Sequence, residues 1–359
     1  MKVVVVGTGY VGLPTGVVLA DLGHEVVCVD NDADKVAKIQ NAESPIYEPG
    51  LVELLRKVLD SGRFTVQVSL PDAMKGAEVV IIAVGTPSGD DGRPDMKYVR
   101  QVAQEIGQNV DCPIVVVNKS TVPVGSGDMV RSIILESGAD PALVSVASCP
   151  EFLREGSAVK DSYNPDRVVI GADSKEAADK LVELYKPLDA PTFVTDVHSA
   201  ELIKYASNSF LATKISFINA ISRVCELSGA DVDEVAKGMG MDARIGAEFL
   251  KAGLGWGGSC FPKDVKGLVT SCSDLGYDFE ILRASQSVND DQTKNFLLRL
   301  KRAIGSYKGK KIALLGLSFK PNTDDIRDAK SLELIEILKA EGATISAYDP
   351  AAMPATRAP

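Results

Sequence analysis

The chain of 359 residues has only two histidines, one tryptophan and six cysteines, and these shortages exclude whole classes of site. His24 and His198 are too few for a histidine-based triad or metal cluster, and we expect His24, in a Leu-Gly-His turn, at the surface. The cysteines contain no C-x-x-C pair, so they predict neither a zinc site nor a disulfide framework. We therefore expect no metal site and a reducing compartment, the cytoplasm. The chemistry must rest on lysine, asparagine, carboxylates and cysteine.

Basic residues and long apolar runs are also scarce. The 39 Lys and Arg against 49 Asp and Glu give a net charge of −10, which argues against non-specific binding to nucleic acid or to an anionic membrane. No run of about 18 apolar residues occurs, and the first apolar strand reaches a glycine too soon for a signal-peptide core. The composition is that of a soluble globular protein of two or three domains.

The first thirty residues carry a dinucleotide-binding fingerprint in its required context. An apolar strand at 3–6 is followed by Gly7-Thr8-Gly9-Tyr10-Val11-Gly12, a helical stretch through Leu22, and a second strand that ends in Asp30. The glycines permit a tight turn and close approach of the pyrophosphate, which rests on the helix N-terminus. Because Asp30 can accept hydrogen bonds from ribose hydroxyls and would repel a 2′-phosphate, the pattern predicts NAD rather than NADP.

Three further apolar runs, at 79–84, 114–118 and 144–147, each end in polar residues. Ligands bind at the carboxyl edge of open parallel sheets, so we expect an α/β fold with a doubly wound, Rossmann-type sheet. The residues that would line the crevice at this edge are Thr86, Thr121, Glu151 and Glu155. A helix cap or turn is an alternative role for each threonine.

A long helix is predicted from Ala200 to about Ser228, with further helices at 232–238, 264–275 and 280–304. Lys204 and Asn208 lie four residues apart and therefore share a face of the long helix. The two side chains are either part of a solvated stripe or, if the face lines a cleft, groups that relay protons and stabilise an oxyanion.

The stretch from Gly255 to Asp264 places Cys260 directly before a predicted helix. Pro262 suits the first turn of a helix, and Asp264 adds a carboxylate there. The unpaired N–H groups at the helix N-terminus and the nearby Lys263 would stabilise a thiolate, which makes Cys260 a candidate nucleophile. The alternative is a buried cysteine beside a glycine turn.

The end of the chain repeats its opening pattern. Two apolar runs that end in Gly316 and Asp349 reproduce the strand, helix, strand order of the first thirty residues. The turn after Gly316 lacks the glycine triplet but gains Lys320, with Arg327 shortly after. Cations in place of glycines suggest a different phosphorylated ligand, and basic residues in a solvated loop are the alternative.

Together these motifs resemble the UDP-glucose/GDP-mannose dehydrogenase family over essentially the whole chain. The stretches that carry the resemblance are Gly7 to Gly12 with Asp30, Val84 to Pro87, Ser120 to Gly125, Pro150 to Gly156, Lys204 to Asn208, Gly257 to Asp264, and Ser318 to Lys320 with Arg327. Phe152 to Glu155 and the glycine-cysteine motif are most similar to the UDP-glucose branch, with GDP-mannose enzymes close behind.

The resemblance implies a four-electron oxidation of a sugar C6 alcohol to a carboxylate with two NAD⁺ molecules, UDP-glucose being the first expected substrate. Cys260 would form a thiohemiacetal and then a thioester. Lys204 and Asn208 would stabilise the oxyanions. Glu151 or Asp264 would help to activate the hydrolytic water, and Thr121 completes the expected catalytic set.

The resemblance also implies the binding residues. The NAD site would be lined by Gly7, Gly9, Tyr10, Val11, Gly12, Asp30, Lys35, Thr86, Thr121, Glu155, Lys263 and Arg327. The substrate would be contacted by Phe152, Leu153, Arg154, Glu155, Lys204, Asn208, Phe249, Leu250, Lys251, Gly253, Gly257 and Lys320. Arg244 would reach the sugar of a neighbouring subunit across a dimer built on the long helix, so a homodimer or higher homo-oligomer is expected.

The expected domains are an NAD-binding Rossmann domain at 1–199, a helical dimerisation and catalytic region at 200–305, and a UDP-sugar-binding, Rossmann-like domain at 306–359. Family members continue well past the Tyr348-Asp349-Pro350 motif, so we expect the third domain to be truncated to one β–α–β unit.

Other functions stay open at this point. A single-step hydroxyacid dehydrogenase can also pair a lysine with an asparagine on a long helix, and it would need no Cys260. A truncated chain could bind NAD without turnover. GDP-mannose or another nucleotide sugar could replace UDP-glucose, since sugar selectivity depends on the shape of the pocket.

Overall fold

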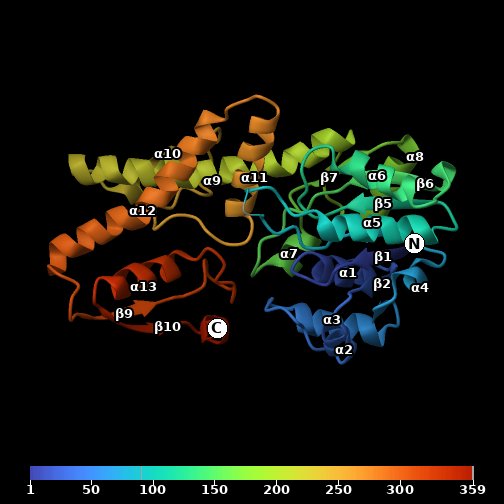
Figure 1. The fold of residues 1–359 in the computed structure, drawn as a ribbon, viewed down its shortest axis with the longest axis horizontal. Coiled ribbons are helices and arrows are strands. Elements are labelled where there is room, and N and C mark those ends of the chain that lie inside the picture. The colour runs from blue at the N-terminus through green and yellow to red at the C-terminus, as the bar shows by residue number, and fades with distance from the viewer. Residues whose placement is uncertain (90, 358–359) are drawn as a thin grey trace. The chain divides into compact units, whose positions relative to one another are not determined.

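The computed structural model describes residues 1–89 and 91–357 (Figure 1). The chain divides into two compact units, Met1–Lys204 and Tyr205–Pro359, which are described separately below.

The first unit is built on one eight-stranded sheet (Figure 1). Its strands are β1 (Lys2–Val6), β2 (Glu25–Val29), β3 (Phe64–Gln67), β4 (Val79–Ile82), β5 (Ile114–Asn118), β6 (Val144–Ser148), β7 (Val168–Ala172) and β8 (Thr192–Thr195). The order is β3-β2-β1-β4-β5-β6-β7-β8, and neighbours are parallel except for the antiparallel pair β6 and β7. The order reverses between β1 and β4, which is where ligands bind in open sheets of this kind.

Helices cover both faces of this sheet because its strands present apolar side chains to both. In β1, Val3 and Val5 belong to one core and Val4 and Val6 to the other, as the two-residue period of a strand requires. The first core contains side chains of α1 (Gly12–Asp21), α3 (Leu51–Asp60) and α8 (Lys175–Tyr185), and the second contains those of α4 (Leu70–Met74), α5 (Lys97–Asn109) and α6 (Ser126–Glu136).

Further elements belong to the first unit, and one of them contributes Val36 and Ile39 to the first core. They are α2 (Ala33–Gln40), α7 (Ala158–Tyr163) and two short 3₁₀ helices, η1 (Pro141–Leu143) and η2 (Lys186–Leu188). Several helices begin at residues that suit an N-cap: Asp32 before α2, Ser69 before α4 and Ser174 before α8 each accept a backbone N–H of the first turn. Local side-chain chemistry thus sets where these helices start.

Helix α9 (Val197–Ser228) is 32 residues long and begins in the first unit. The second unit continues with α10 (Val232–Gly240), α11 (Phe261–Asp274) and α12 (Glu280–Ile304), then β9 (Lys311–Leu315), α13 (Lys330–Ala340), β10 (Thr344–Tyr348) and α14 (Met353–Arg357). Strands β9 and β10 form a two-stranded parallel sheet. One core of this unit is centred on Tyr205, Trp256 and Leu268, and another on Leu297, Tyr307 and Leu334.

The α/β fold predicted from the sequence is confirmed: a Rossmann-type sheet is followed by a long helix and a second parallel β–α–β unit. The long helix begins at Val197, three residues before the predicted start. The prediction for His24 is wrong, because its side chain is buried and Nε2 lies 3.0 Å from the carbonyl oxygen of Leu184 at the end of α8. None of the helices in residues 1–89 and 91–357 has the length and apolarity that crossing a membrane requires.

Candidate active site

The turn between β1 and α1 has the geometry that the glycine fingerprint predicts. Gly7 has φ +102°, and a Cβ at Gly12 would lie 1.8 Å from the carbonyl oxygen of Gly7, so both positions require glycine. A Cβ at Gly9, in contrast, would meet no atom within 4 Å. The backbone at Gly9 is therefore open to a ligand, which fits a pyrophosphate bound at the N-terminus of α1.

Asp30 closes this turn from the end of β2. Its Oδ2 accepts hydrogen bonds from the backbone nitrogen of Thr8 at 2.9 Å and from Thr8 Oγ1 at 2.6 Å, and its Oδ1 accepts one from the nitrogen of Asp32 at 3.1 Å. Burial raises the pKa of Asp30, but these hydrogen bonds outweigh it and hold the pKa below its usual value. The carboxylate is thus ionised at neutral pH, and Oδ1 keeps capacity to accept a ribose hydroxyl.

The loops that follow β4 and β5 are joined at the carboxyl edge of the sheet. Thr86 Oγ1 donates a hydrogen bond to the carbonyl oxygen of Thr121 at 3.0 Å, and Ser120 Oγ donates one to that of Val84 at 2.7 Å. The N-cap of α6 is Gly125 rather than Thr121. Neither threonine is the N-cap of the helix that follows it, so the helix-cap alternative is wrong for both.

Lys204 pairs with Glu151 from the loop after β6. Nζ of the lysine donates to Glu151 Oε1 at 2.9 Å, and the side chains are only 4% and 6% exposed. Glu151 Oε2 accepts a further hydrogen bond from the nitrogen of Leu153 at 2.6 Å, and the Phe152 ring centroid lies 5.4 Å from Nζ. Lys204 is therefore not part of a solvated stripe, and the pair brings a cation and a carboxylate together where water is largely excluded.

The loop that carries Phe152 to Glu155 is held by acids that the sequence patterns did not single out. Arg154 donates to Asp161 through its backbone nitrogen, Nε and a terminal guanidinium nitrogen, at 2.7–3.0 Å. Glu48 accepts hydrogen bonds from the nitrogens of Gly156 and Ala158 at 2.8 and 2.7 Å. Glu48 is 108 residues away from Gly156 in the sequence, and no local pattern signals such a bond.

In the second unit, Cys260 is the N-cap residue of α11 and is partly exposed. Pro262 lies in the first turn, as expected, and Cys260 Sγ lies 3.5 Å from Ser259 Oγ. Cys260 thus lies at the positive end of the helix and is not fully buried. The position favours a nucleophile over the alternative of a buried structural cysteine.

One turn after Cys260, Asp264 is fully buried between two polar side chains. It accepts a hydrogen bond from Asn208 Nδ2 of α9 at 2.6 Å, and its Oδ1 lies 2.6 Å from Lys263 Nζ. The carboxylate is charge-compensated by the lysine, and the asparagine is fixed with its amide nitrogen toward the acid. Asn208 therefore does not belong to a solvated stripe either.

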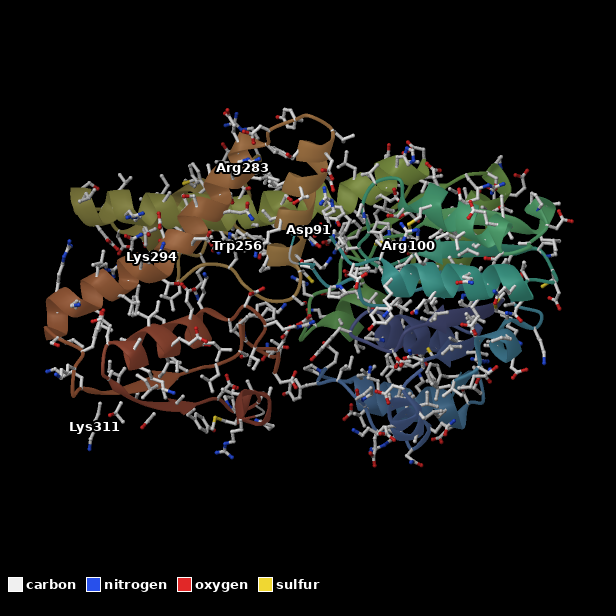
Figure 2. All side chains as sticks on the ribbon, viewed as in Figure 1. Asp91, Arg100, Trp256, Arg283, Lys294 and Lys311 are labelled. Carbon is white, nitrogen blue, oxygen red and sulfur yellow. The ribbon has the colours of Figure 1, made fainter. Side chains whose placement is uncertain are left out.

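The loop before Cys260 is fixed by α9 and α12. Asn289 of α12 accepts a hydrogen bond from the nitrogen of Trp256 at 2.7 Å and donates one to its carbonyl oxygen at 3.1 Å. The indole of Trp256, labelled in Figure 2, donates to Ser216 Oγ of α9 at 2.9 Å. Three hydrogen bonds thus hold one loop residue four positions before the thiol.

The glycines of this loop are required by the chain's own packing. A Cβ at Gly255 would lie 2.6 Å from Asn289 Oδ1, one at Gly257 would lie 2.0 Å from the carbonyl oxygen of Asp328, and one at Gly258 would lie 2.5 Å from the Phe319 ring. Gly258 also donates its N–H to the carbonyl oxygen of Arg327 at 2.9 Å. At these three glycines, α12 and the segment that follows β9 therefore approach the loop closely.

The turn of the second β–α–β unit differs from the first in the role of its aspartate. Asp349 Oδ2 accepts hydrogen bonds from the nitrogens of Leu317 and Ser318 at 2.8 and 3.2 Å, and Oδ1 accepts two more, from Ala351 and Ala352, at 2.8 Å each. Burial raises the pKa of Asp349, but the four backbone bonds outweigh it and lower the pKa far below its usual value. Both oxygens are occupied, so this aspartate is structural, unlike Asp30.

Other predicted binding residues make separate contacts of their own. In the first unit, Lys35 Nζ lies 4.0 Å from Asp32 in an exposed pair. In the second unit, Arg244 is exposed and pairs with Asp242 at 2.6 Å, Arg327 pairs with Asp325 at 2.7 Å, and Lys320 lies over the Phe319 ring. The remaining predicted contacts are Tyr10, Val11, Phe249, Leu250, Lys251 and Gly253, of which Gly253 donates its N–H to Asn219 at 2.8 Å.

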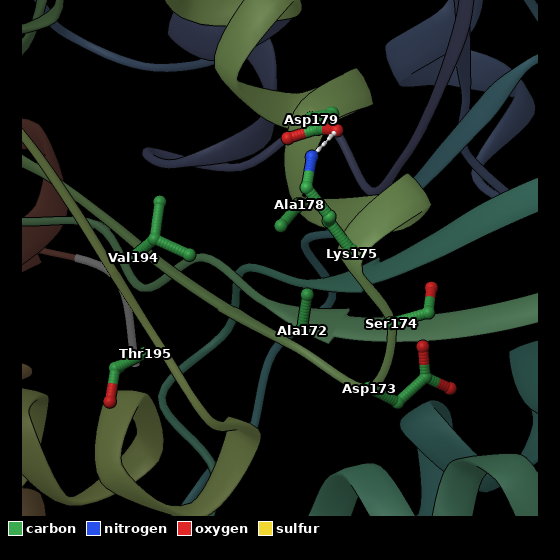
Figure 3. Close-up of a pocket in the computed structure, with 8 residues that line it drawn as sticks. All are labelled: Ala172, Asp173, Ser174, Lys175, Ala178, Asp179, Val194 and Thr195. Atoms are coloured by element: carbon green, nitrogen blue, oxygen red, sulfur yellow. Dashed lines mark hydrogen bonds and ion pairs between the residues drawn. The ribbon is translucent and has the colours of Figure 1, made fainter.

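A cavity of about 500 Å³ lies elsewhere in the first unit, beside the ends of β7 and β8 (Figure 3). Its lining includes Lys175 and Asp179, which pair with each other, and none of the predicted site residues. No group of three or more His, Cys, Asp or Glu side chains that could hold a metal occurs within the part of the chain that the structure describes.

An open glycine turn at the switch point of a parallel sheet, closed by an ionised aspartate, defines a dinucleotide-binding protein, and Cys260 adds a candidate nucleophile. Three family models cover most of the chain: the NAD binding domain of the UDP-glucose/GDP-mannose dehydrogenase family matches residues 1–189, its central domain 198–291, and its UDP binding domain 313–358. The chain belongs to this family, whose members are NAD-dependent nucleotide-sugar dehydrogenases. The predicted resemblance and the predicted cofactor, NAD, are confirmed.

Individual relatives agree with the family assignment. The chain is 50% identical over 353 residues to UDP-glucose 6-dehydrogenase YwqF of Bacillus subtilis, a match that covers 98% of this chain and 80% of the relative. It is 46% identical over 359 residues to UDP-glucose 6-dehydrogenase of Pseudomonas aeruginosa, covering 98% and 79%. The structure of a UDP-glucose dehydrogenase from the archaeon Pyrobaculum islandicum matches with a TM-score of 0.96 and 41% identity, covering 99% of this chain and 83% of that one.

Proposed function

We propose that this chain oxidises the C6 alcohol of UDP-glucose to the carboxylate of UDP-glucuronate in two NAD-dependent steps. The observation that carries the proposal is the partly exposed Cys260 thiol at the N-terminus of α11, in a chain that is 46–50% identical to several UDP-glucose 6-dehydrogenases. A thiol in this position supplies the covalent handle that a second oxidation needs.

The chain's residues have defined tasks toward the cofactor. NAD⁺ supplies the oxidising power by accepting one hydride from C6 in each step. The open backbone at Gly9 and the N-terminus of α1 bind its pyrophosphate, and Asp30 accepts hydrogen bonds from the ribose hydroxyls. Thr86 and Thr121, hydrogen-bonded to each other, extend this site along the edge of the sheet.

In the first oxidation, the C6 hydroxyl gives up its proton to a base or water, and C6 becomes an aldehyde when the hydride leaves. Lys204, already held by Glu151, carries a positive charge that stabilises the negative charge developing on the C6 oxygen. Asn208, held by Asp264, supplies an amide for the same purpose.

In the second oxidation, the thiolate of Cys260 forms a C–S bond to C6, and the aldehyde oxygen takes a proton to give a thiohemiacetal. Loss of the second hydride and of that proton leaves a thioester. Water then attacks C6, the C–S bond breaks, and the carboxylate and the thiol are released. Glu151 or Asp264 accepts the proton of the attacking water. The sum is four electrons per sugar.

The test is the number of NADH molecules formed per UDP-glucose consumed. We expect two for the wild-type chain, loss of the second oxidation in Cys260→Ser, and wild-type stoichiometry in Cys272→Ser, a control on the same helix. One NADH per sugar with no effect of Cys260→Ser would favour a single-step dehydrogenase. No NADH despite measurable NAD binding would contradict the proposed activity.

We also propose that the chain works as a homodimer or higher homo-oligomer in the cytoplasm. On α9, Phe210, Phe217 and Val224 recur every seven residues, and each side chain is more than half exposed. An apolar stripe of this spacing on a helix is typical of a surface that packs against another helix. The exposed Arg244 is available to a neighbouring subunit, and all six cysteines lie outside disulfides, which suits a reducing compartment.

A further inference from the structure

Glu201, in the second turn of α9, is a buried carboxylate. It is not among the predicted site residues and has no role in the proposed mechanism. Its side chain is 2% exposed. Oε2 accepts a hydrogen bond from the nitrogen of Gly125 at 2.7 Å, and Oε1 accepts one from the nitrogen of Gly127 at 2.8 Å. Gly125 is the N-cap of α6, so a side chain 76 residues away in the sequence occupies the unpaired N–H groups at the start of that helix.

The start of α9 is closely packed around these bonds. A Cβ at Gly127 of α6 would lie 2.5 Å from Val197 Cγ1, and a Cβ at Gly171 of β7 would lie 2.5 Å from the Cβ of Ala200. The first turns of α9 therefore lie directly against the backbone of α6 and of β7. Two glycines and one carboxylate together fix where α9 begins.

Glu201 connects two parts of the candidate active site. Three residues further along α9 is Lys204, which pairs with Glu151 from the loop after β6. On the other side, the segment that ends at Gly125 begins with Ser120 and Thr121 of the loop after β5. A continuous set of hydrogen bonds and short chain segments thus joins the loops that follow β5 and β6 through one carboxylate.

We propose that Glu201 is a positioning residue: its ionised carboxylate, bonded to Gly125 and Gly127, holds the Thr121 loop and the Lys204 turn of α9 in one arrangement. We name these two hydrogen bonds the Glu201 clamp. The inference rests on the proposed function, in which Thr121 serves the cofactor site and Lys204 stabilises the oxyanions.

The clamp requires the ionised form of Glu201, because a protonated carboxyl turns one of its two acceptor oxygens into a hydroxyl. Burial raises the pKa of Glu201 to about 7, against the opposing effect of the hydrogen bonds from Gly125 and Gly127. The charged groups that act on it are His198 of α9, which lowers the pKa, and Asp128 of α6, which raises it. The clamp is thus complete above about pH 7 and weakened below.

The experiment compares full-length wild type, Glu201→Gln and Asp128→Asn, with NAD and UDP-glucose. Glutamine keeps the size of the side chain but can accept from only one of the two amides. At pH 8 we expect kcat of Glu201→Gln to fall about tenfold, since small displacements of catalytic groups have effects of this size or larger. The KM for UDP-glucose should stay within about twofold and the melting temperature should not fall, because glutamine avoids burying a charge.

Two further readouts separate positioning from stability. The kcat of the wild type should fall as the pH drops through about 7, and this step should be absent in Glu201→Gln. Asp128→Asn removes the partner of His198 but not the clamp, so it should keep the wild-type kcat at pH 8. The inference would be overturned if Glu201→Gln kept the wild-type kcat and the wild-type pH profile. It would also be overturned if the variant lost activity only to the extent that its melting temperature fell.

Hydrogen exchange at the amides of Gly125 and Gly127 measures the clamp without turnover. We expect exchange at least about tenfold faster in Glu201→Gln than in the wild type at pH 8, because a freed amide loses its protection. Unchanged exchange would overturn the inference even if the wild type formed no NADH. Absent NADH formation together with faster exchange would instead contradict the proposed function and leave the clamp supported.

Discussion

Asn289 offers the sharpest test of how the loop before Cys260 is held. The side chain is 3% exposed and satisfies both backbone groups of Trp256, at 2.7 and 3.1 Å. Asn289→Ala would leave a buried N–H and a buried carbonyl without partners. Each unsatisfied buried group costs about 1–3 kcal/mol, so we expect a loss of about 2–6 kcal/mol in the free energy of unfolding of this unit.

The functional effect should be selective. Cys260 lies four residues beyond Trp256, so a loosened loop displaces the thiol, whereas the cofactor turn is in the other unit. We expect NAD affinity within about twofold of the wild type and a drop of about tenfold or more in the second oxidation, seen as NADH per UDP-glucose falling from two toward one.

The matched control is Asn295→Ala on the same helix. Asn295 bonds Arg223 in an exposed position, and such contacts contribute about 1 kcal/mol or less. Denaturant melts of the three proteins give the free energies, and the assay of NADH per sugar gives the selectivity. If Asn289→Ala melts like Asn295→Ala and still forms two NADH per sugar, the argument that Asn289 fixes the loop is refuted.

Four further outcomes are expected. Asp30→Ala should weaken NAD binding, measured by titration calorimetry, because the ribose loses its acceptor. Gly257→Ala should lower the melting temperature, since its Cβ would lie 2.0 Å from a carbonyl oxygen. Gly9→Ala has open space around the new Cβ, so it should leave stability unchanged and reduce NAD affinity. Lys204→Ala should cost about 3–5 kcal/mol in a denaturant melt by leaving a buried carboxylate unpaired. Finally, the pKa of Glu201 rises on folding from 4.5 to about 7, so the folded state binds more protons than the unfolded state between these pH values. The free energy of unfolding should therefore fall as the pH rises from about 4.5 to 7. Glu201→Gln should flatten this dependence.

Local sequence was sufficient to predict several of the secondary elements. The apolar run before Gly7, the glycine turn and Asp30 predicted the β–α–β unit correctly, because a strand period of two, turn glycines and helix-start residues act within a few positions of one another. The same local logic placed Cys260 at the start of a helix, and in the structure it is the N-cap of α11.

The partners of these residues were decided only by the tertiary structure. Lys204 meets Glu151 across 53 residues, Glu201 meets Gly125 across 76, and Asn289 meets Trp256 across 33. Periodicity shows which residues share a face of an element, but not which element packs against that face. For that reason the sequence left Lys204 and Asn208 between a solvated stripe and a buried site, and only the packing of α9 resolved it.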